Sequence, residues 1–242
     1  MLSGSNAVIL LAVASAAALP AVAQGSPASA ERNPAIQPHL VGVVSRLSPD
    51  VLYRGWRWRQ LVGQRALAAD DGRELGSVRD VVVDADGRIA ALIVEGGASG
   101  IPEAVHRIPW SQIDLTPDRD GVAVRLGSGP RPEYTLFPGS EGVSTLPREF
   151  RVSELVGDYA RLQPGSGYGS VSDAVFTADG RLMAVLIARE ASAGGTYAFP
   201  AGSFRAGWDP GWSYYGLPFV TPSQAETAGL RVEAGRFARN VL

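Results

Sequence analysis

Runs of β-branched residues flank a short polar turn at two places in the chain. In the first half, residues 74–84 and 88–95 lie on either side of the turn Asp-Ala-Asp-Gly at 84–87. In the second half, residues 181–190 follow the similar turn Thr-Ala-Asp-Gly at 177–180. β-Branched residues favour strands, and Asp-Gly favours a tight turn because glycine accepts a positive φ. The pattern therefore predicts a β-hairpin in each half.

In the second strand of the first predicted hairpin, every residue from 89 to 94 is hydrophobic. Ile89, Ala91 and Ile93 point to one face, and the alternating residues Ala90, Leu92 and Val94, which point to the other, are also hydrophobic. A strand exposed to water on one face would alternate between hydrophobic and polar residues. We therefore expect this strand to be covered on both faces, inside a small closed barrel or at a contact between two barrels.

The similarity between the two halves extends beyond the hairpins. The residues Gly76, Ser77, Val78 and Asp80 recur 93 positions later as Gly169, Ser170, Val171 and Asp173. Leu-Val-Gly at 61–63 recurs at 155–157, and Ile-Pro at 108–109 corresponds to Phe-Pro at 199–200. An offset that drifts by so few residues over this length indicates a tandem duplication.

These patterns predict an all-β protein made of two small β-barrels in tandem, packed on each other as a pseudo-dimer, with few or no helices outside the N-terminal segment. The predicted boundaries are residues 55–126 for the first domain, 127–148 for a linker rich in Gly, Pro and Ser, and 149–235 for the second domain. Residues 121–126 are expected to close the first barrel, and residues 228–234 the second. One helical turn is expected after Pro222.

The N-terminal residues 1–23 carry a hydrophobic segment typical of an export signal. Ala21 and Ala23 are small residues in the positions that signal peptidase accepts, although the head of the segment has no Lys or Arg. We expect cleavage after Ala23, a periplasmic or secreted protein, and a flexible tether at residues 24–39, which are too polar to offset the cost of ordering. A buried hydrophobic helix and an uncleaved membrane anchor are the alternatives.

The composition excludes several kinds of chemistry. The chain has no cysteine, which rules out disulfides, cysteine-bound metals and thiol nucleophiles. It has only two histidines, His39 and His106, too few for catalysis that needs several imidazoles. The net charge of -2 gives no basic face for a nucleic acid. We therefore expect no cofactor, no metal, no catalytic residue and no nucleic-acid partner.

Three polar motifs have both a functional and a structural interpretation. Asp84 and Asp86 imitate the start of a calcium loop, but the glycine comes too early and the glutamate at the twelfth position is missing, so a turn is favoured. Glu103 and His106 could orient an imidazole, yet no nucleophile is placed near them, and a solvated loop is favoured. The glycines at 96–100 lack the sequence of a phosphate-binding loop and are interpreted as a hairpin tip.

Asp80 and Asp173 form a fourth case, because both are acidic residues inside predicted strands. Either could serve as a functional acid. A carboxylate in such a place more often accepts backbone hydrogen bonds at a barrel rim, and we favour this structural role.

Two groups of aromatic residues stand out. Trp56 and Trp58 alternate with arginines, and at strand spacing they share one face, so we expect them to pack onto the first barrel or to form a contact surface. The segment at 204–220 has no counterpart in the first half and contains four residues that we treat as a candidate interaction site: Trp208, Trp212, Tyr214 and Tyr215. These rings either plug a barrel end or bind a partner.

The motifs as a whole resemble the PRC-barrel domain family, which is named after the cytoplasmic part of the photosynthetic reaction-centre H subunit. The resemblance rests on Leu61 to Gly63, Val78 to Asp80, Asp84 to Gly87 and Ile108 to Trp110 in the first half. The second half keeps much of this pattern but has Gln-Pro-Gly-Ser-Gly-Tyr-Gly at 163–169 and no tryptophan after Pro200. The resemblance implies two PRC-barrel-like β-barrels that act as an assembly surface.

We therefore expect a non-catalytic scaffold in the periplasm that binds an unidentified protein partner or an envelope complex. Association with a membrane would come through that complex or through an uncleaved N-terminus. The alternative is a small-ligand carrier or an enzyme, with carboxylates and arginines forming a site in a cleft between the barrels. Fold alone does not decide between these functions.

Overall fold

The computed structural model describes residues 47–96, 105–118, 121–124, 148–189, 194–201 and 208–237. These residues all belong to one compact unit, Ala35–Leu242. The other unit, Met1–Pro34, lies outside the described residues, as do the predicted signal peptide, the tether and nearly all of the linker.

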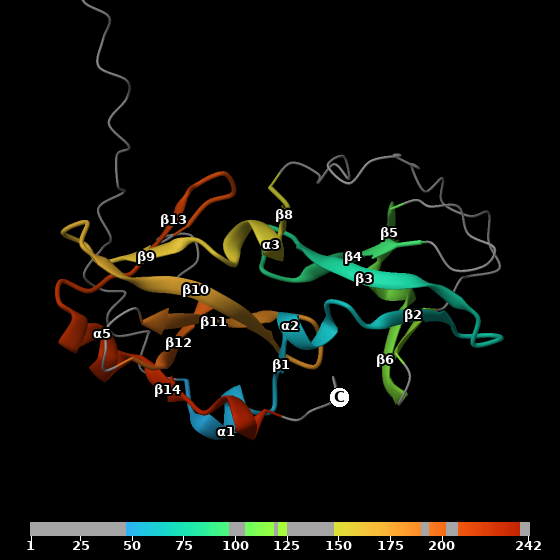
Figure 1. Cartoon of the computed structure of the whole chain (residues 1–242), viewed down its shortest axis with the longest axis horizontal. Helices are drawn as coiled ribbons and strands as arrows, with labels where there is room; N and C mark the ends of the chain where they lie inside the picture. The colour runs from blue at the N-terminus through green and yellow to red at the C-terminus, as the bar shows by residue number, and fades with distance from the viewer. Residues whose placement is uncertain are drawn as a thin grey trace, which may run out of the picture. The chain divides into compact units, whose positions relative to one another are not determined.

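Two β-sheets account for about half of the described residues and the helices are few and short, which confirms the all-β prediction (Figure 1). The strands of the first sheet are β2 (Arg65–Ala68), β3 (Glu74–Val83), β4 (Ile89–Glu95), β5 (Val105–Pro109), β6 (Ile113–Asp118), β7 (Gly121–Val124) and β8 (Phe150–Arg151). They follow the order β5-β4-β3-β2-β7-β6, and β8 pairs with β3. All neighbours are antiparallel except β2 and β7, which are parallel.

The second sheet repeats much of this arrangement. Its strands are β1 (Trp56–Arg57), β9 (Tyr159–Arg161), β10 (Gly167–Phe176), β11 (Leu182–Arg189), β12 (Thr196–Pro200), β13 (Tyr214–Gly216) and β14 (Leu230–Val232). Their order is β13-β9-β10-β11-β12-β14, and β1 pairs with β10. The strands β9 to β12 thus follow the same order as β2 to β5, and β13 runs parallel to β9 as β7 does to β2.

Both predicted hairpins are present, as β3–β4 and β10–β11. Asp84 forms the first turn, because its Oδ1 accepts hydrogen bonds from the amides of Asp86 and Arg88, both at 2.9 Å. In the second turn, the hydroxyl of Thr177 accepts a hydrogen bond from the Arg181 amide at 3.0 Å. The structural interpretation of the 84–87 motif as a turn is therefore confirmed.

The two hairpin turns also contact each other. The Ile89 amide donates to the Gly180 carbonyl at 2.8 Å, and the Leu182 amide donates to the Gly87 carbonyl at 2.7 Å. Ile89 and Leu182 are 93 residues apart, as are Gly87 and Gly180, so the two bonds are reciprocal. The hairpin turns therefore join the first sheet to the second.

Each sheet also receives one strand from the other half of the chain. β1 lies within the predicted first domain but pairs with β10, with Trp56 opposite Phe176. β8 lies within the predicted second domain but pairs with β3, with Phe150 opposite Val83. The sequence predicts that each half builds its own barrel, whereas in the structure the short strands at the start of each half are exchanged.

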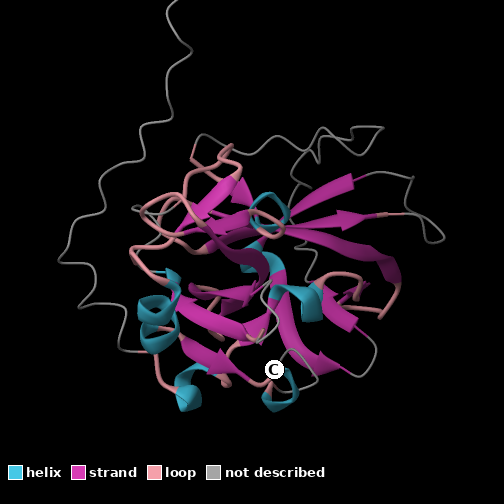
Figure 2. Ribbon diagram, turned by 60° about the vertical axis from the view of Figure 1, so that its left-hand side comes forward, coloured by secondary structure: helices cyan, strands magenta, loops and turns pink. Residues whose placement is uncertain are grey.

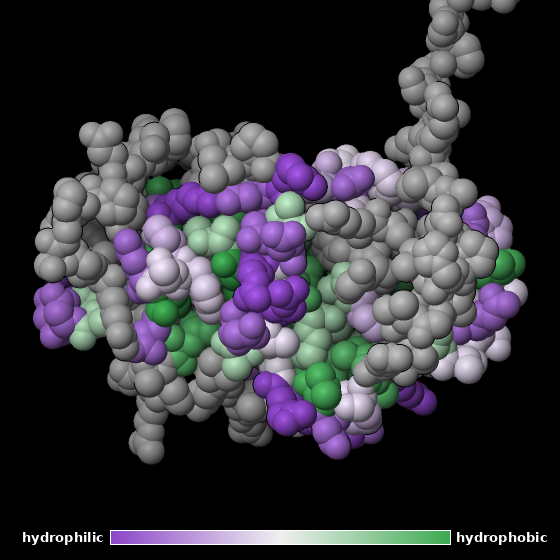
Figure 3. All heavy atoms as spheres, turned by 180° about the vertical axis from the view of Figure 1, so that it is seen from behind, coloured by the Kyte–Doolittle hydropathy of each residue, from purple (hydrophilic) through white to green (hydrophobic). Residues whose placement is uncertain are grey.

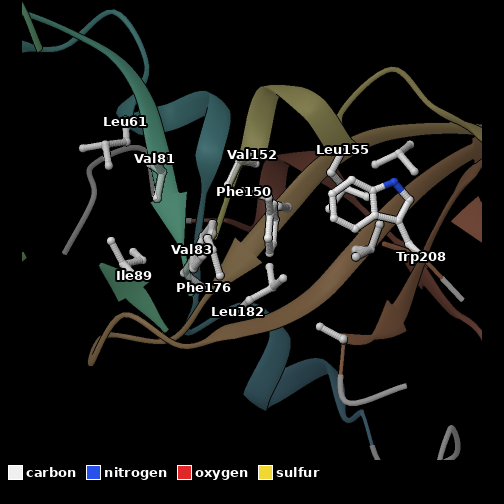
Figure 4. Packing of buried hydrophobic residues seen from close by; sticks show 14 of the residues in the cluster. Leu61, Val81, Val83, Ile89, Phe150, Val152, Leu155, Phe176, Leu182 and Trp208 are labelled. Atoms are coloured by element: carbon white, nitrogen blue, oxygen red, sulfur yellow. The ribbon is translucent and has the colours of Figure 1, made fainter. Parts of the chain in front are cut away.

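Among the described residues, the largest of three hydrophobic clusters contains residues of both sheets. It includes Val81 and Val83 of the first sheet and Phe176 and Leu182 of the second, with Phe150 of the exchanged strand β8 among them (Figure 4). Each of these side chains is buried. On the face shown in Figure 3, hydrophilic side chains gather near the middle, with hydrophobic areas beside them. Hydrophobic side chains of both sheets thus pack together where the described parts of the two sheets meet.

The helices are short, and several of them lie at the edge of the molecule (Figure 2). They are α1 (Pro49–Leu52), α2 (Trp58–Leu61), α3 (Val152–Leu155) and α5 (Pro222–Ala228), together with the 3-10 turns η3 (Trp110–Gln112) and η5 (Ala234–Arg236). The helical turn predicted after Pro222 is confirmed, and the Thr221 hydroxyl caps it by accepting from the Gln224 amide at 3.2 Å. Within the described ranges, no helix is long and hydrophobic enough to cross a membrane.

Three predictions of local structure are wrong. Trp58 begins helix α2 and does not continue the strand of Trp56, so the two rings do not share a strand face. The segment predicted to close the second barrel contains β14, but β14 pairs with β12. The strand that corresponds to β7 is β13, which belongs to the aromatic segment that was expected to have no counterpart.

Candidate functional site

The carboxylate of Asp80 is buried where α3 of the second half meets β3. Its Oδ1 accepts hydrogen bonds from the Ser153 amide at 3.2 Å, from Trp58 Nε1 at 3.1 Å and from the Val81 amide at 2.8 Å. The Ser153 hydroxyl donates to Oδ2. Burial raises the pKa of Asp80 even though these hydrogen bonds favour the ionised form. The residue therefore has the structural role that was favoured from the sequence.

Asp173 occupies the corresponding place in the second sheet. Its Oδ1 accepts from the Arg59 amide at 3.2 Å and from the Ala174 amide at 3.0 Å. Arg57 Nη1 lies 3.9 Å from Oδ2, which is close enough for attraction but too far for a hydrogen bond. Burial raises the pKa of Asp173, and the hydrogen bonds and the two arginines lower it by less.

Trp56, the other aromatic residue of this region, packs against the second sheet and not only against the first. Its ring stacks on Phe176 with centroids 4.8 Å apart, and it lies 6.3 Å from Trp110. Its Nε1 donates to the Thr177 carbonyl at 3.1 Å. Since Trp56 is 2% exposed, the packing interpretation holds for this residue.

Three of the four candidate interaction residues are buried within the chain. Trp208 is 2% exposed, donates from Nε1 to Asp158 Oδ2 at 2.6 Å and packs edge-on against Phe150. Tyr215 belongs to the main core, where burial raises its pKa. Tyr214 is also buried, and only Trp212 is partly exposed. The barrel-packing alternative therefore describes Trp208 and Tyr215, while an interaction role for the segment stays a prediction.

The other two aromatic residues are Tyr214, in β13, and Trp212, which precedes this strand and packs partly buried against the main core. Tyr215 faces the core, so its neighbour Tyr214 points to the opposite side. Trp212 and Tyr214 stack with centroids 5.5 Å apart, and Arg161 Cζ lies 4.6 Å from the centre of the Tyr214 ring. Tyr159, opposite Tyr214 in the β9–β13 pairing, is 58% exposed. These four residues, Tyr159, Arg161, Trp212 and Tyr214, are called the ring surface below.

Sequence reasoning missed two members of the ring surface, Tyr159 and Arg161. The alternation in Tyr-Ala-Arg-Leu at 159–162 was the available signal, because the small and aliphatic residues alternate there with an aromatic and a charged residue. Ala160 and Leu162 are indeed buried in the core. The same alternation places Tyr159 and Arg161 on the outer side.

The remaining candidates give no site. His106 lies in strand β5 and not in a loop, and burial lowers its pKa. Glu103 and the glycines at 97–100 lie outside the described residues. Across the ranges that the structure describes, no three Asp, Glu or His side chains are grouped closely enough to hold a metal ion.

Comparison with known proteins gives one family. The family model for the PRC-barrel domain matches residues 56–120, which include the strands β1 to β6. The resemblance predicted for the first half is therefore confirmed over these residues. The match does not extend to the second half, whose assignment stays a prediction. No curated protein shows significant similarity to the chain.

Proposed function

We propose that the chain is a non-catalytic, exported scaffold of two PRC-barrel-like halves packed as a pseudo-dimer, and that it docks a protein partner on the ring surface. The observation that carries this proposal is the stack of Trp212, Tyr214 and Arg161 beside the exposed Tyr159. Trp, Tyr and Arg are the residues that most often dominate the binding energy of protein interfaces. The ring surface thus combines these residue types, with Tyr159 exposed, Trp212 and Arg161 partly exposed, and Tyr214 buried.

The position of β13 at the end of its sheet supports docking. In the first sheet, β7 has β2 on one side and β6 on the other. β13 corresponds to β7, yet among the described strands it pairs only with β9. A strand at the edge of a sheet can add a further strand from another chain through its backbone. We therefore place the partner's extended segment where β6 lies in the first sheet.

Strand β6 also indicates the chemistry that this segment should have. Ile113 and Leu115 pack against the core, and Asp114 alternates with them. Arg161 has no carboxylate within ion-pair distance among the described residues. An acidic side chain of the partner could therefore form an ion pair with its guanidinium. The expected partner is a protein with an extended segment in which hydrophobic and acidic residues alternate.

Two observations support the pseudo-dimer within this proposal. The exchanged strands β1 and β8 pair with corresponding strands, and the turn hydrogen bonds between the halves are reciprocal. The largest hydrophobic cluster contains residues of both halves and so joins them into one body. Such a body holds the ring surface on rigid strands, which suits a scaffold.

We do not adopt the alternative of a ligand carrier or enzyme with a site between the barrels. Hydrophobic side chains pack together where the described parts of the sheets meet. The Asp80 carboxylate there is bound by four donors of the chain itself. The binding role needs neither a cleft nor a reactive group.

Site-specific photo-cross-linking tests the proposed function. A photoreactive phenylalanine analogue would replace Tyr159 in the full chain, expressed in cells of the source species, and Val51 on α1 would serve as the matched control because it is 40% exposed. We expect a discrete cross-linked protein from position 159 and none from position 51, with loss of the product on Trp212→Ala. Identical products from both positions, or persistence after Trp212→Ala, would show that the ring surface is not the docking site. Sequencing the mature N-terminus from the same cells tests export.

A further inference from the structure

The two buried aspartates differ in one hydrogen bond. Ser153 and Arg59 hold the second position of α3 and α2, and their amides donate to Oδ1 of Asp80 and Asp173 at the same distance, 3.2 Å. At Asp80, the Ser153 hydroxyl also donates to Oδ2. At Asp173 the corresponding residue is Arg59, whose side chain turns away to donate from Nε to the Ser172 carbonyl at 2.7 Å. Within the described part of the chain, no residue thus supplies a hydroxyl to Asp173 Oδ2.

Two polar atoms near this position lack hydrogen-bond partners among the described residues. Asp173 is 3% exposed, and its Oδ2 is buried without a donor. Arg57 Nε is buried without an acceptor, although Nη1 of the same guanidinium lies 3.9 Å from Asp173 Oδ2. Buried polar groups in native proteins are almost always hydrogen-bonded, to the protein or to ordered water. Asp173 Oδ2 therefore lacks a donor, and Arg57 Nε lacks an acceptor.

We propose that Asp173 Oδ2 and Arg57 Nε bind one hydroxyl oxygen, in the position that the Ser153 hydroxyl takes against Asp80. A hydroxyl oxygen fits both needs, because it donates its proton to the carboxylate and accepts the N–H of the guanidinium. A second carboxylate would be repelled by Asp173, and an ammonium group could not accept from Arg57. Phe237, whose ring centre lies 5.1 Å from Arg57 Cζ, covers the guanidinium on one side.

The hydroxyl can come from water or from a small polyol. One substitution, at Arg59, tests the site itself. Arg59→Ser places a hydroxyl on α2 where Ser153 has one on α3, so it should satisfy Asp173 internally and displace the bound molecule. Arg59→Ala is the matched control, since both variants lose the bond to Ser172 and Arg59 is exposed. Both variants are made in the full chain.

The first measurement is the urea unfolding equilibrium of the two variants. We expect the unfolding constant of Arg59→Ser to be about three- to tenfold lower than that of Arg59→Ala, because a covalently attached hydroxyl avoids the entropic cost of immobilising a free molecule. The difference should vanish when Asp173→Ala is added to both. Equal stability of the two variants with Asp173 intact would overturn the proposal.

The second measurement identifies the source of the hydroxyl. A high-resolution crystal structure of the full chain should show an oxygen within hydrogen-bond distance of both Asp173 Oδ2 and Arg57 Nε, absent in Arg59→Ser. Direct closure of Arg57 onto Asp173, with no oxygen between them, would overturn the proposal. Unfolding midpoints in glycerol then separate the two sources: equal gains for the natural chain and Arg59→Ser indicate water, and a larger gain for the natural chain indicates a polyol.

Discussion

Asp80 and Ser153 lie 73 residues apart in the sequence, yet the Asp80 carboxylate accepts from both the amide and the hydroxyl of Ser153. Asp80 belongs to β3 of the first sheet. Ser153 belongs to helix α3, which connects β8 of the first sheet to β9 of the second. The pair therefore fastens one half of the chain to the other at a buried point.

Removal of the Asp80 carboxylate should destabilise the whole fold. Asp80→Ala leaves the Ser153 amide, Trp58 Nε1 and the Val81 amide without their acceptor, so we expect a loss of about 2–4 kcal/mol in the free energy of unfolding. Urea denaturation followed by circular dichroism measures it. Asp209→Ala is the control, because Asp209 is exposed and should change stability by less than about 0.5 kcal/mol. Equal losses in the two variants would contradict the assigned role.

The buried aspartates also predict how stability depends on pH. Burial raises the pKa of Asp173 above the ordinary value of 3.8 that applies in the unfolded chain. Between these two pKa values the folded chain binds more protons, so this contribution to stability is complete below 3.8 and is lost as the pH rises through the higher pKa. The free energy of unfolding of the natural chain, relative to Asp173→Asn, should therefore increase as the pH falls from about 7 to about 4.

Urea unfolding at fixed pH values gives this difference directly. Asp80→Asn should behave in the same way, since burial raises the pKa of Asp80 as well. A relative stability that stays constant, or that decreases on acidification, would show that the folded pKa values are not raised.

Gly169 should be intolerant of any side chain. A Cβ at this position would lie 2.1 Å from the Ala188 carbonyl oxygen, so Gly169→Ala should cost at least about 2 kcal/mol in the free energy of unfolding. Gly167 lies on the same strand, but a Cβ added there would meet no atom within 4 Å, and Gly167→Ala should change stability by less than about 1 kcal/mol. Thermal and urea denaturation of both variants test the contrast. Similar values for the two would mean that β10 and β11 do not approach as closely as described.

The aromatic segment should divide into a structural and a surface part. Trp208→Phe removes the bond to Asp158 from a buried ring, and we expect a loss of about 1–3 kcal/mol in the free energy of unfolding. Trp212→Phe keeps a ring in a partly exposed place and should cost less than about 0.5 kcal/mol. The reverse order in urea denaturation would place Trp212 in the core and leave the ring surface without its main ring.

The elements that were predicted correctly depend on neighbouring residues. The hairpins follow from β-branched runs around Asp-Gly, and helix α5 follows from Thr221 and Pro222 at its start. Each of these signals acts over a few residues. The sequence repeat between the two halves also predicted that β9–β12 correspond to β2–β5, because a repeat relates distant segments directly.

The features that were missed depend on pairing between distant segments. Trp56 lies opposite Phe176, and nothing in the local pattern of residues 56–58 distinguishes this partner from one within its own half. The same holds for β13. Without its pairing to β9, Tyr214 and Tyr215 are interpreted as part of an insertion. The ring surface was missed in part because Tyr159 is identified only by the burial of its neighbours.

The central claim is that the two halves form one body through the exchanged strands β1 and β8. A specific protease site inserted between residues 127 and 147 of the full chain allows the connection to be cut after folding. We predict that the cleaved fragments remain together in size-exclusion chromatography and native mass spectrometry, with an unchanged circular dichroism spectrum, until urea unfolds both at once. Separation into two folded halves under native conditions would contradict the claim.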